Sequence, residues 1–165
     1  MKELFPVLAA TALAPRHPYA LLDHLGSLGL AVSRSALYRQ VERLRREGLA
    51  AAELESGETG HLRRRLQLTE AGRAALAAAA REVLGSAPLE SPEFALALAA
   101  AETAGIADAE ELLRARMAAA ARQLTALERD LRTGSDPFAV ARERQAAHLR
   151  ADIGWLQQQL RRRAG

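Results

Sequence analysis

The residues with the clearest chemistry in this chain of 165 residues are the arginines between Ser33 and Leu49, in the stretch SRSALYRQVERLRREGL. Five arginines occupy the thirteen positions 34–46. A guanidinium group remains charged at physiological pH and can donate two parallel hydrogen bonds to a phosphate or to the edge of a guanine base. The stretch therefore indicates binding to a polyanion such as nucleic acid.

These arginines could also be present without any role in binding. A run of charge on a helix often forms only its solvated face. Arginine also supplies 22 of the 23 basic residues, a bias that a GC-rich genome would produce without any function. The formal net charge is +3, and residues 1–85 contain 12 basic and 9 acidic side chains, so the first half holds the whole excess.

Other kinds of functional site have little support in the sequence. Without cysteine there is no disulfide, thiol nucleophile or thiolate metal site, and the four histidines are scattered rather than placed at metal-ligand spacing. We find no glycine-rich phosphate loop, no nucleophile with an evident base and no paired carboxylates in a plausible cleft. We therefore expect no enzyme activity, no cofactor and no metal.

The first fifteen residues, MKELFPVLAATALAP, resemble a signal peptide only in part. Lys2 and the apolar run fit that pattern, but Glu3 and Pro6 do not. No apolar run approaches the roughly 20 residues that span a bilayer. These features predict a cytoplasmic protein without a membrane partner.

The elements that must position the arginines are delimited by capping residues and helix breakers. Three helices are expected first, at residues 3–13, 18–29 and 33–48. Ser33 or Ser35 can cap the third helix, and Gly48 can end it. The core face of this helix carries Leu37, Val41 and Leu44, which leaves the arginines on the rest of its surface.

A hairpin is expected next, with strands at residues 49–55 and 61–68 joined by SGETG, whose glycines permit a tight connection. The second strand alternates leucines on one face with Arg63, Arg65 and Gln67 on the other, and Arg64 falls on the apolar side. A lone hairpin is only marginally stable, so it must pack on the helices. Thr69 should cap a fourth helix that Gly85 ends.

The segment SAPLESP, residues 86–92, is the clearest candidate domain boundary. Three more helices are expected beyond it, at 92–103, 109–132 and 137–162. In the last two, leucines recur at alternating spacings of three and four residues, which predicts an antiparallel helical hairpin. Part of this apolar seam would remain uncovered, and a second copy of the chain could cover it.

Three helices followed by a hairpin are the layout of a winged helix-turn-helix, in which the third helix enters the major groove of DNA. The sequence resembles the PadR family of bacterial transcription regulators in RHPYALLDHL (16–25), VSRSALYRQVERLRREGL (32–49) and RRRLQLTEAGR (63–73). Two departures concern base contacts: Arg39 stands where the family commonly has proline, and Arg65 and Leu66 replace the usual aromatic residues near the end of the wing.

The resemblance implies a mainly α fold with a small β-hairpin wing. Residues 1–85 would form a winged helix DNA-binding domain, and residues 92–163 a helical dimerisation domain. The implied function is that of a homodimeric repressor that binds an inverted repeat in double-stranded DNA. The implied DNA contacts come from the third helix and the wing: Arg34, Ser35, Tyr38, Arg39, Arg45, Arg46, His61, Arg63, Arg64 and Arg65.

Trp155, the only tryptophan, has two candidate roles. It could be the wall of a site for a small aromatic effector, because PadR-like proteins are often released from DNA by phenolic or drug-like ligands. It could instead anchor the dimer interface. For the chain as a whole, the alternative to a DNA-binding regulator is a winged-helix module for protein–protein interaction without specific DNA binding.

Overall fold

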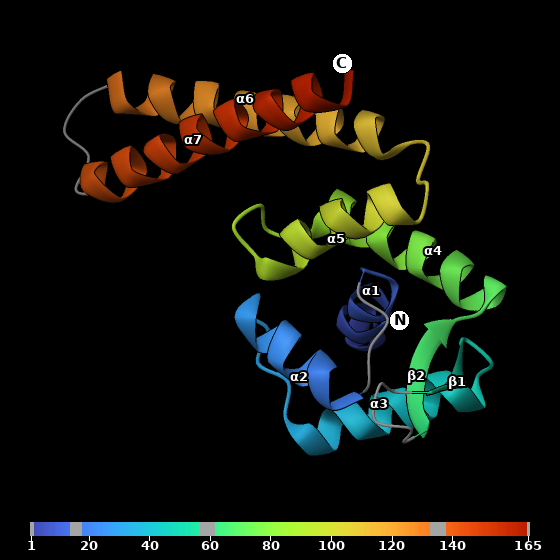
Figure 1. Ribbon diagram of the computed structural model, residues 1–165. Helices are drawn as coiled ribbons and strands as arrows, with labels where there is room; N and C mark the ends of the chain where they lie inside the picture. Colours follow the sequence, from blue (N-terminus) through green and yellow to red (C-terminus); the bar gives the residue numbers. More distant parts are fainter. Residues whose placement is uncertain (1, 14–17, 57–61, 133–137, 165) are drawn as a thin grey trace. The chain divides into compact units, whose positions relative to one another are not determined.

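The computed structural model describes residues 2–13, 18–56, 62–132 and 138–164. The fold is mainly helical with one two-stranded antiparallel sheet, as the sequence predicts (Figure 1). Contacts between Cα atoms divide the chain into two compact units, Met1–Ile106 and Ala107–Gly165, called unit 1 and unit 2 below. Over the described ranges, no helix is both long enough and apolar enough to cross a membrane.

Unit 1 contains eight elements in chain order: η1 (Lys2–Leu4, a 3-10 helix), α1 (Phe5–Leu13), α2 (Pro18–Ser27), α3 (Arg34–Arg46), β1 (Ala50–Ser56), β2 (Leu62–Leu68), α4 (Glu70–Ser86) and α5 (Pro92–Thr103). Unit 2 contains α6 (Ala109–Arg132) and α7 (Ala139–Ala164). All the expected helices and both strands are therefore present, with ends shifted by a few residues.

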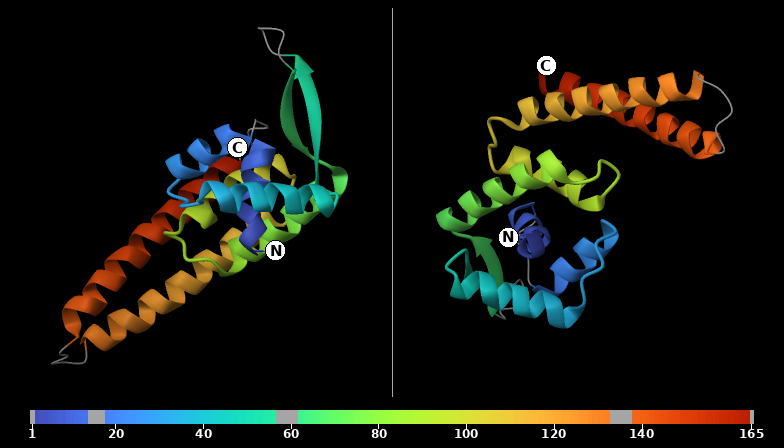
Figure 2. Two further views of the ribbon diagram at one scale, coloured as in Figure 1. Left: turned by 90° about the horizontal axis from the view of Figure 1, so that it is seen from below. Right: turned by 180° about the vertical axis from the view of Figure 1, so that it is seen from behind.

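Helix α1 is the centre of the unit 1 core. Its residues are apolar except for Thr11, whose hydroxyl donates to the Val7 carbonyl at 2.7 Å, and such a helix has to be buried on most sides. Phe5, Val7 and Leu8 are each no more than 1% exposed. The helix contacts α2, α4, α5 and β2, and two of the views show it in the middle of these elements (Figures 1 and 2). The other elements of unit 1 are held in place through it.

Helix α3 begins and ends at the residues that the sequence indicates. The Ser33 hydroxyl accepts a hydrogen bond from the Ala36 amide at 3.2 Å, which satisfies a donor of the first turn. At the other end, Gly48 has φ +68°, and the Leu49 amide donates to the Leu44 carbonyl at 2.8 Å. This left-handed glycine stops the helix and turns the chain into the wing.

The wing is a regular antiparallel hairpin whose register runs from Ala50 opposite Leu68 to Ser56 opposite Leu62. Leu66, in the strand that contacts α1, is only 2% exposed. Two strands alone bury too little apolar surface to be stable. The hairpin is therefore anchored to the helical core through β2.

Helix α5 lies in unit 1, whereas the sequence pattern places residues 92–103 in the second domain. The compact units divide after Ile106, not within residues 86–92. Phe94, Leu96 and Ala97 of α5 are each at most 3% exposed, and the helix packs on α1 and α4. A helix without a polar face needs cover on several sides. The prolines before α5 therefore mark a turn within unit 1.

Two helix ends differ from expectation. Gly85 does not stop α4, which continues to Ser86, where the hydroxyl donates to the Glu82 carbonyl at 2.7 Å. Helix α7 runs from Ala139 to Ala164 rather than over residues 137–162. The expected start of that helix, Asp136–Pro137, lies outside the described residues.

Unit 2 is a hairpin of two antiparallel helices whose inner side carries the predicted leucine seam. Leu113 of α6 and Leu156 of α7 are fully buried, and Ala120 and Leu149 are nearly so. Two ion pairs join the helices: Arg142 Nη1 lies 2.9 Å from Asp130 Oδ2, and Arg150 Nη2 lies 2.6 Å from Glu128 Oε1. Apolar packing and paired charges therefore both hold the hairpin closed.

Helix α4 passes unusually close to the chain that leaves α3. A Cβ atom built on Gly72 would lie 1.9 Å from the carbonyl oxygen of Leu49. Real carbon and oxygen atoms do not approach so closely, and the obstacle is backbone that cannot swing away. Glycine at position 72 is therefore a steric requirement of the fold.

Replacing Gly72 by alanine should lower the free energy of unfolding by about 1–3 kcal/mol, because α4 and Leu49 must move apart to admit the methyl group. Urea unfolding followed by circular dichroism measures this change. Gly85→Ala in the same helix is the matched control, since its Cβ would meet nothing within 4 Å. The control should be stabilising by about 0.5–1 kcal/mol. Equal effects of the two changes would contradict the steric role of Gly72.

Candidate nucleic-acid interface

The side of α3 that faces away from the core forms a ridge of polar residues. Leu37, Val41 and Leu44 are buried on the core side. Ser35, Arg39, Glu42 and Arg46 follow one another at spacings of four, three and four residues on the opposite side, and all four are exposed. This outward ridge is the part of α3 that can enter a groove of DNA.

Two of the five arginines of α3 form ion pairs with glutamates of the same helix or of its C-cap. Arg43 Nε donates to Glu47 Oε1 at 2.7 Å, and Arg45 Nη1 donates to Glu42 Oε1 at 2.8 Å. The bond and the charge of Glu47 raise the pKa of Arg43 above its usual value, so that this group stays charged. Arg43 and Arg45 are therefore partly engaged within the protein.

Arg39 and Arg46 form no hydrogen bond or ion pair with any described residue. They lie seven residues apart on the outward ridge, about 10 Å along the helix at 1.5 Å per residue. Arg34, by contrast, makes a contact within the protein. Arg39 and Arg46 are thus the guanidinium groups of α3 with the most freedom to bind an external anion.

Tyr38 is exposed to 44%, although the sequence also allows its ring to pack against the second helix. It lies on the flank of α3 beside the outward ridge, near the N-terminal end of the helix. An exposed phenol can donate or accept a hydrogen bond at a phosphate or a base edge. Ser35 and Tyr38 therefore add hydrogen-bonding groups to Arg39 and Arg46.

A hollow of about 200 Å³ lies where η1 meets α3, lined by Glu3, Leu4, Ala36, Arg39, Gln40 and Arg43. Glu3 adds to the negative field that raises the pKa of Arg43. Gln40 Oε1 is buried here, and no described group donates to it. The sequence pattern gave no sign of this hollow, because it depends on the contact between two separate helices.

The wing is less basic than the sequence pattern of its second strand suggests. The register places Glu53 opposite Arg65, Leu54 opposite Arg64 and Glu55 opposite Arg63. Over residues 50–68 the three arginines are balanced by three glutamates, at positions 53, 55 and 58. Arg64 is the wing arginine whose cross-strand neighbour carries no charge. His61 lies outside the described residues, and Arg63 and Arg64 are placed by the register alone.

A cluster of hydrogen bonds to main-chain groups joins the end of α3 to the base of the wing. The Thr69 hydroxyl donates to the Gly48 carbonyl at 2.7 Å and accepts from the Gly72 amide at 3.0 Å. The Thr69 amide donates to the Leu49 carbonyl at 3.1 Å, and Arg73 Nη1 donates to the Leu68 carbonyl at 3.1 Å. We call these contacts the Thr69 clasp. The clasp fixes α3 and the wing relative to each other.

A metal site finds no support in the described part of the chain. Among the residues with described placement, no three His, Asp or Glu side chains are grouped so as to hold a metal ion. His24 is partly buried on α2, and His148 belongs to α7 in the other unit. The arrangement on α3 is suited to binding a polyanion.

The comparisons with known proteins concern the same part of the chain. Residues 7–78 match the family model described as Transcriptional regulator PadR-like family. These residues form a PadR-like domain. The matched range runs from α1 into α4, so it contains α3, the wing and the Thr69 clasp.

One solved structure aligns with most of the chain. Bacillus subtilis PadR in complex with operator DNA is similar with 14% sequence identity, a TM-score of 0.43 and coverage of 95% of this chain and 97% of that chain. No curated protein matches the chain by sequence.

In the PadR-like domain, the clasp gives a physical reason for the run Leu68–Arg73, which in the sequence is only a motif. Thr69 caps α4, Gly72 admits the Leu49 carbonyl and Arg73 holds the last carbonyl of the wing. Trp155 is 37% exposed on α7 and belongs to unit 2. The DNA contacts expected on α3 belong to unit 1, so Trp155 is not one of them.

Thr69→Val should lower the free energy of unfolding by about 1–2 kcal/mol, because valine keeps the shape but neither caps α4 nor bonds to Gly48. Thr69→Ser keeps the hydroxyl and should cost less than half as much. Urea unfolding of both variants measures the difference. A loss in Thr69→Ser as large as that in Thr69→Val would contradict the assignment of the role to the hydroxyl, because serine lacks only the methyl group.

Proposed function

We propose that this chain is a sequence-specific DNA-binding transcriptional regulator whose PadR-like domain places α3 in the major groove of double-stranded DNA. The observation that carries the proposal is the outward ridge of α3, on which Arg39 and Arg46 are engaged by no described residue. The match of residues 7–78 to a family of transcriptional regulators supports the same function. Ser35 and Tyr38 would contribute hydrogen bonds near the start of the helix.

In this proposal the wing has a smaller role than the helix. Because residues 50–68 carry no net formal charge, the wing adds little to the general attraction for phosphates. Its phosphate contacts would be those that the family resemblance implies, Arg63, Arg64, Arg65 and His61. Arg34 and Arg45 would assist from α3.

We further propose that the protein acts as a homodimer through α7. On the side of α7 away from α6, Val140, Ala147, Ala151 and Trp155 follow one another at spacings of seven, four and four residues, and all are exposed. Small residues beside an aromatic anchor allow two helices to approach closely. A twofold axis here would present two copies of α3 to an inverted repeat.

The regulator would repress transcription from the cytoplasm by occupying its operator. A small aromatic effector that binds the two states of the dimer unequally would relieve this repression. Trp155 serves either role that the sequence suggests, since a ring exposed to 37% can stack on an effector or on the partner chain. We favour the dimer seam, because the small residues Ala147 and Ala151 adjoin the tryptophan on the same side of α7.

A protein-interaction module is the second candidate function. The neutral wing favours it, because a module that does not bind DNA has no need of a basic wing. Arg39 and Arg46 of the outward ridge, which no described residue engages, favour DNA binding. The two candidates differ in what the ridge arginines bind, which the next experiment measures.

Arg39→Ala should weaken binding to an operator duplex about 5–100-fold, the range expected when one good arginine–base interaction is removed. The duplex is selected from a random-sequence library by repeated binding to the wild-type protein. Arg43→Ala is the matched control, because Glu47 holds that guanidinium and η1 flanks it. It should change affinity less than about twofold. Failure of the library to converge on any sequence would refute specific DNA binding.

Ala151→Glu should convert the dimer to a monomer, because it places a charge in the α7 seam without disturbing an isolated hairpin in which Ala151 is exposed. Light scattering at micromolar concentration measures the mass. Ala126→Glu on α6, an exposed alanine away from the seam, should leave the dimer intact. A wild-type mass of one chain, or an unchanged dimer in Ala151→Glu, would contradict the proposed interface.

A further inference from the structure

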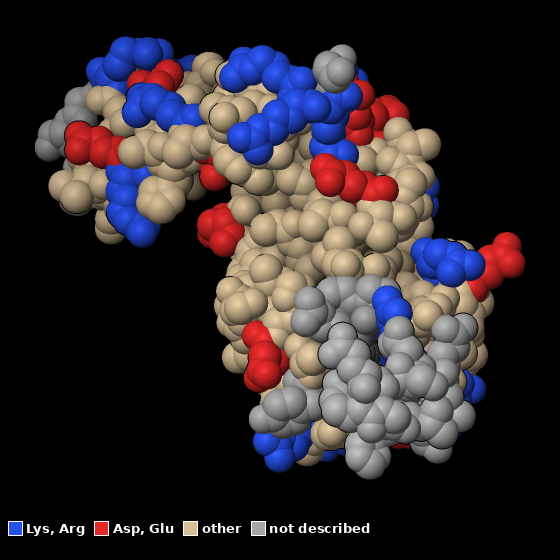
Figure 3. Space-filling model, in the orientation of Figure 1, with Lys and Arg blue, Asp and Glu red and all other residues tan. Residues whose placement is uncertain are grey.

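The net positive charge of the chain lies in unit 2. Divided at the boundary of the compact units, residues 1–106 contain 12 basic and 12 acidic side chains, whereas residues 107–165 contain 11 basic and 8 acidic ones. The formal excess of +3 therefore belongs entirely to the helical hairpin. Arginine side chains cover much of the visible face of this hairpin (Figure 3).

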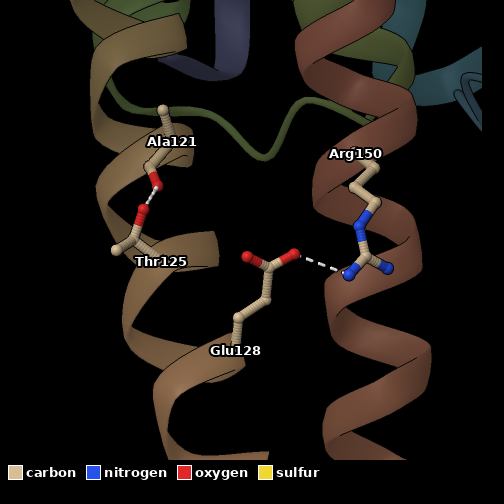
Figure 4. Close-up of polar contacts among 4 residues, drawn as sticks. All are labelled: Ala121, Thr125, Glu128 and Arg150. Carbon is tan, nitrogen blue, oxygen red and sulfur yellow. Dashed lines mark hydrogen bonds and ion pairs between the residues drawn. The ribbon is translucent and has the colours of Figure 1, made fainter.

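Acidic and basic side chains are segregated on α6. Between Leu112 and Arg132 this helix has two acidic residues, and each reaches an arginine of α7: Asp130 bonds to Arg142, and Glu128 bonds to Arg150. Figure 4 shows Glu128 extending from α6 toward Arg150, while Thr125 bonds within its own helix to the Ala121 carbonyl at 3.0 Å. The carboxylates of this stretch are thus neutralised inside the hairpin.

Arginines on the other side of α6 are not neutralised in this way. Arg122 and Arg129 lie seven residues apart on the side opposite Leu113 and Ala120, and Arg132 follows one turn later. All three are exposed, and none bonds to a residue that the structure describes. We call Arg122, Arg129 and Arg132 the α6 ridge.

Stabilisation of the helix end does not explain the whole ridge. Arg129 and Arg132 lie in the last turn, where a positive charge is favourable beside the negative end of the helix dipole. Arg122 lies ten residues before the end, where this effect has vanished. No acidic residue lies one turn away from Arg122 on either side, because positions 118, 119, 125 and 126 are alanine or threonine.

We propose that the α6 ridge is a second nucleic-acid contact, which binds the phosphate backbone of duplex DNA without reading its sequence. Guanidinium groups suit phosphates, and those of Arg122 and Arg129 are about 10 Å apart along α6, near the rise of three base pairs. The ridge lies on α6 and the proposed dimer seam on α7, so the two proposed contacts use different helices of the hairpin. This proposal rests on the proposed function, since a DNA-binding regulator would use such a contact to strengthen operator binding.

The test compares the full-length Arg122→Gln/Arg129→Gln variant with wild type in DNA binding at several salt concentrations. Without these two side chains, the slope of log affinity against log salt should fall by about 0.9 for each phosphate that is no longer neutralised. Affinity should fall by the same factor for the selected operator and for a scrambled duplex of equal length. The preference for the operator should remain unchanged.

Arg161→Gln/Arg162→Gln is the matched control, because it removes the same formal charge from two exposed arginines of unit 2 that lie outside the ridge. An equal decrease of the salt slope in this control would mean that only the net charge matters, and would refute the phosphate contact of the α6 ridge. An unchanged slope in the ridge variant would overturn it as well. So would a defect confined to vesicles of anionic lipid, with DNA binding intact, because the surface would then be a lipid contact.

The same measurements separate this proposal from the proposed function. Salt-dependent binding that depends on the ridge but shows no operator preference would uphold the ridge and refute sequence-specific regulation. Operator preference that is lost in Arg39→Ala, together with an unchanged salt slope in the α6 ridge variant, would support the proposed function and refute the phosphate contact of the α6 ridge.

Discussion

The spacing between α3 and the wing depends on the contact of the Leu49 carbonyl with the first turn of α4. The chain leaves α3 through Gly48 and returns from the wing at Leu68, and the Thr69 clasp ties both points together by hydrogen bonds. The wing hairpin is attached to the rest of unit 1 through this junction and through the buried side chain of Leu66. Because the clasp uses only the side chains of Thr69 and Arg73, which follow the second strand, it places no demand on the side chains of the wing.

Ion pairs with glutamates determine which arginines of α3 can bind an external anion. Exposed ion pairs contribute little stability, typically about 0–1 kcal/mol, so Glu42 and Glu47 act mainly by orienting Arg45 and Arg43. They also reduce the charge of the helix and hence its attraction for any polyanion. With unit 1 neutral as a whole, its net charge adds little to the attraction for a polyanion. Additional affinity then has to come from charge elsewhere in the chain.

Local determinants of the fold could be predicted from the sequence, and contacts between distant segments could not. Ser33 and Thr69 cap helices as expected, because a cap acts within three residues of itself. The place of α5 depends on its fit against α1 and α4, which no local pattern records. Pro88 and Pro92, the latter being the first residue of α5, suggested a domain boundary, yet the alanine-rich surface of the helix is buried in unit 1.

The candidate site was predictable to a similar extent. Periodicity separates the core face of α3 from its arginines, but only the folded helix distinguishes the paired Arg43 and Arg45 from Arg39 and Arg46. The register of the hairpin likewise decides which wing arginine faces leucine. Gly72 could not be interpreted sterically from sequence, because the carbonyl that it admits lies 23 positions earlier in the chain, at Leu49.

Assigning α5 to unit 1 also changes where the charge of the molecule lies. Glu90, just before α5, and Glu93 and Glu102, within it, balance the positive charge of unit 1. The excess positive charge of the chain therefore lies in the hairpin of α6 and α7. There the same two carboxylates, Glu128 and Asp130, close the hairpin and leave the outer arginines of α6 uncompensated. The proposed dimer seam on α7 and the proposed phosphate contact on α6 use different helices, so both proposals can apply to one helical hairpin.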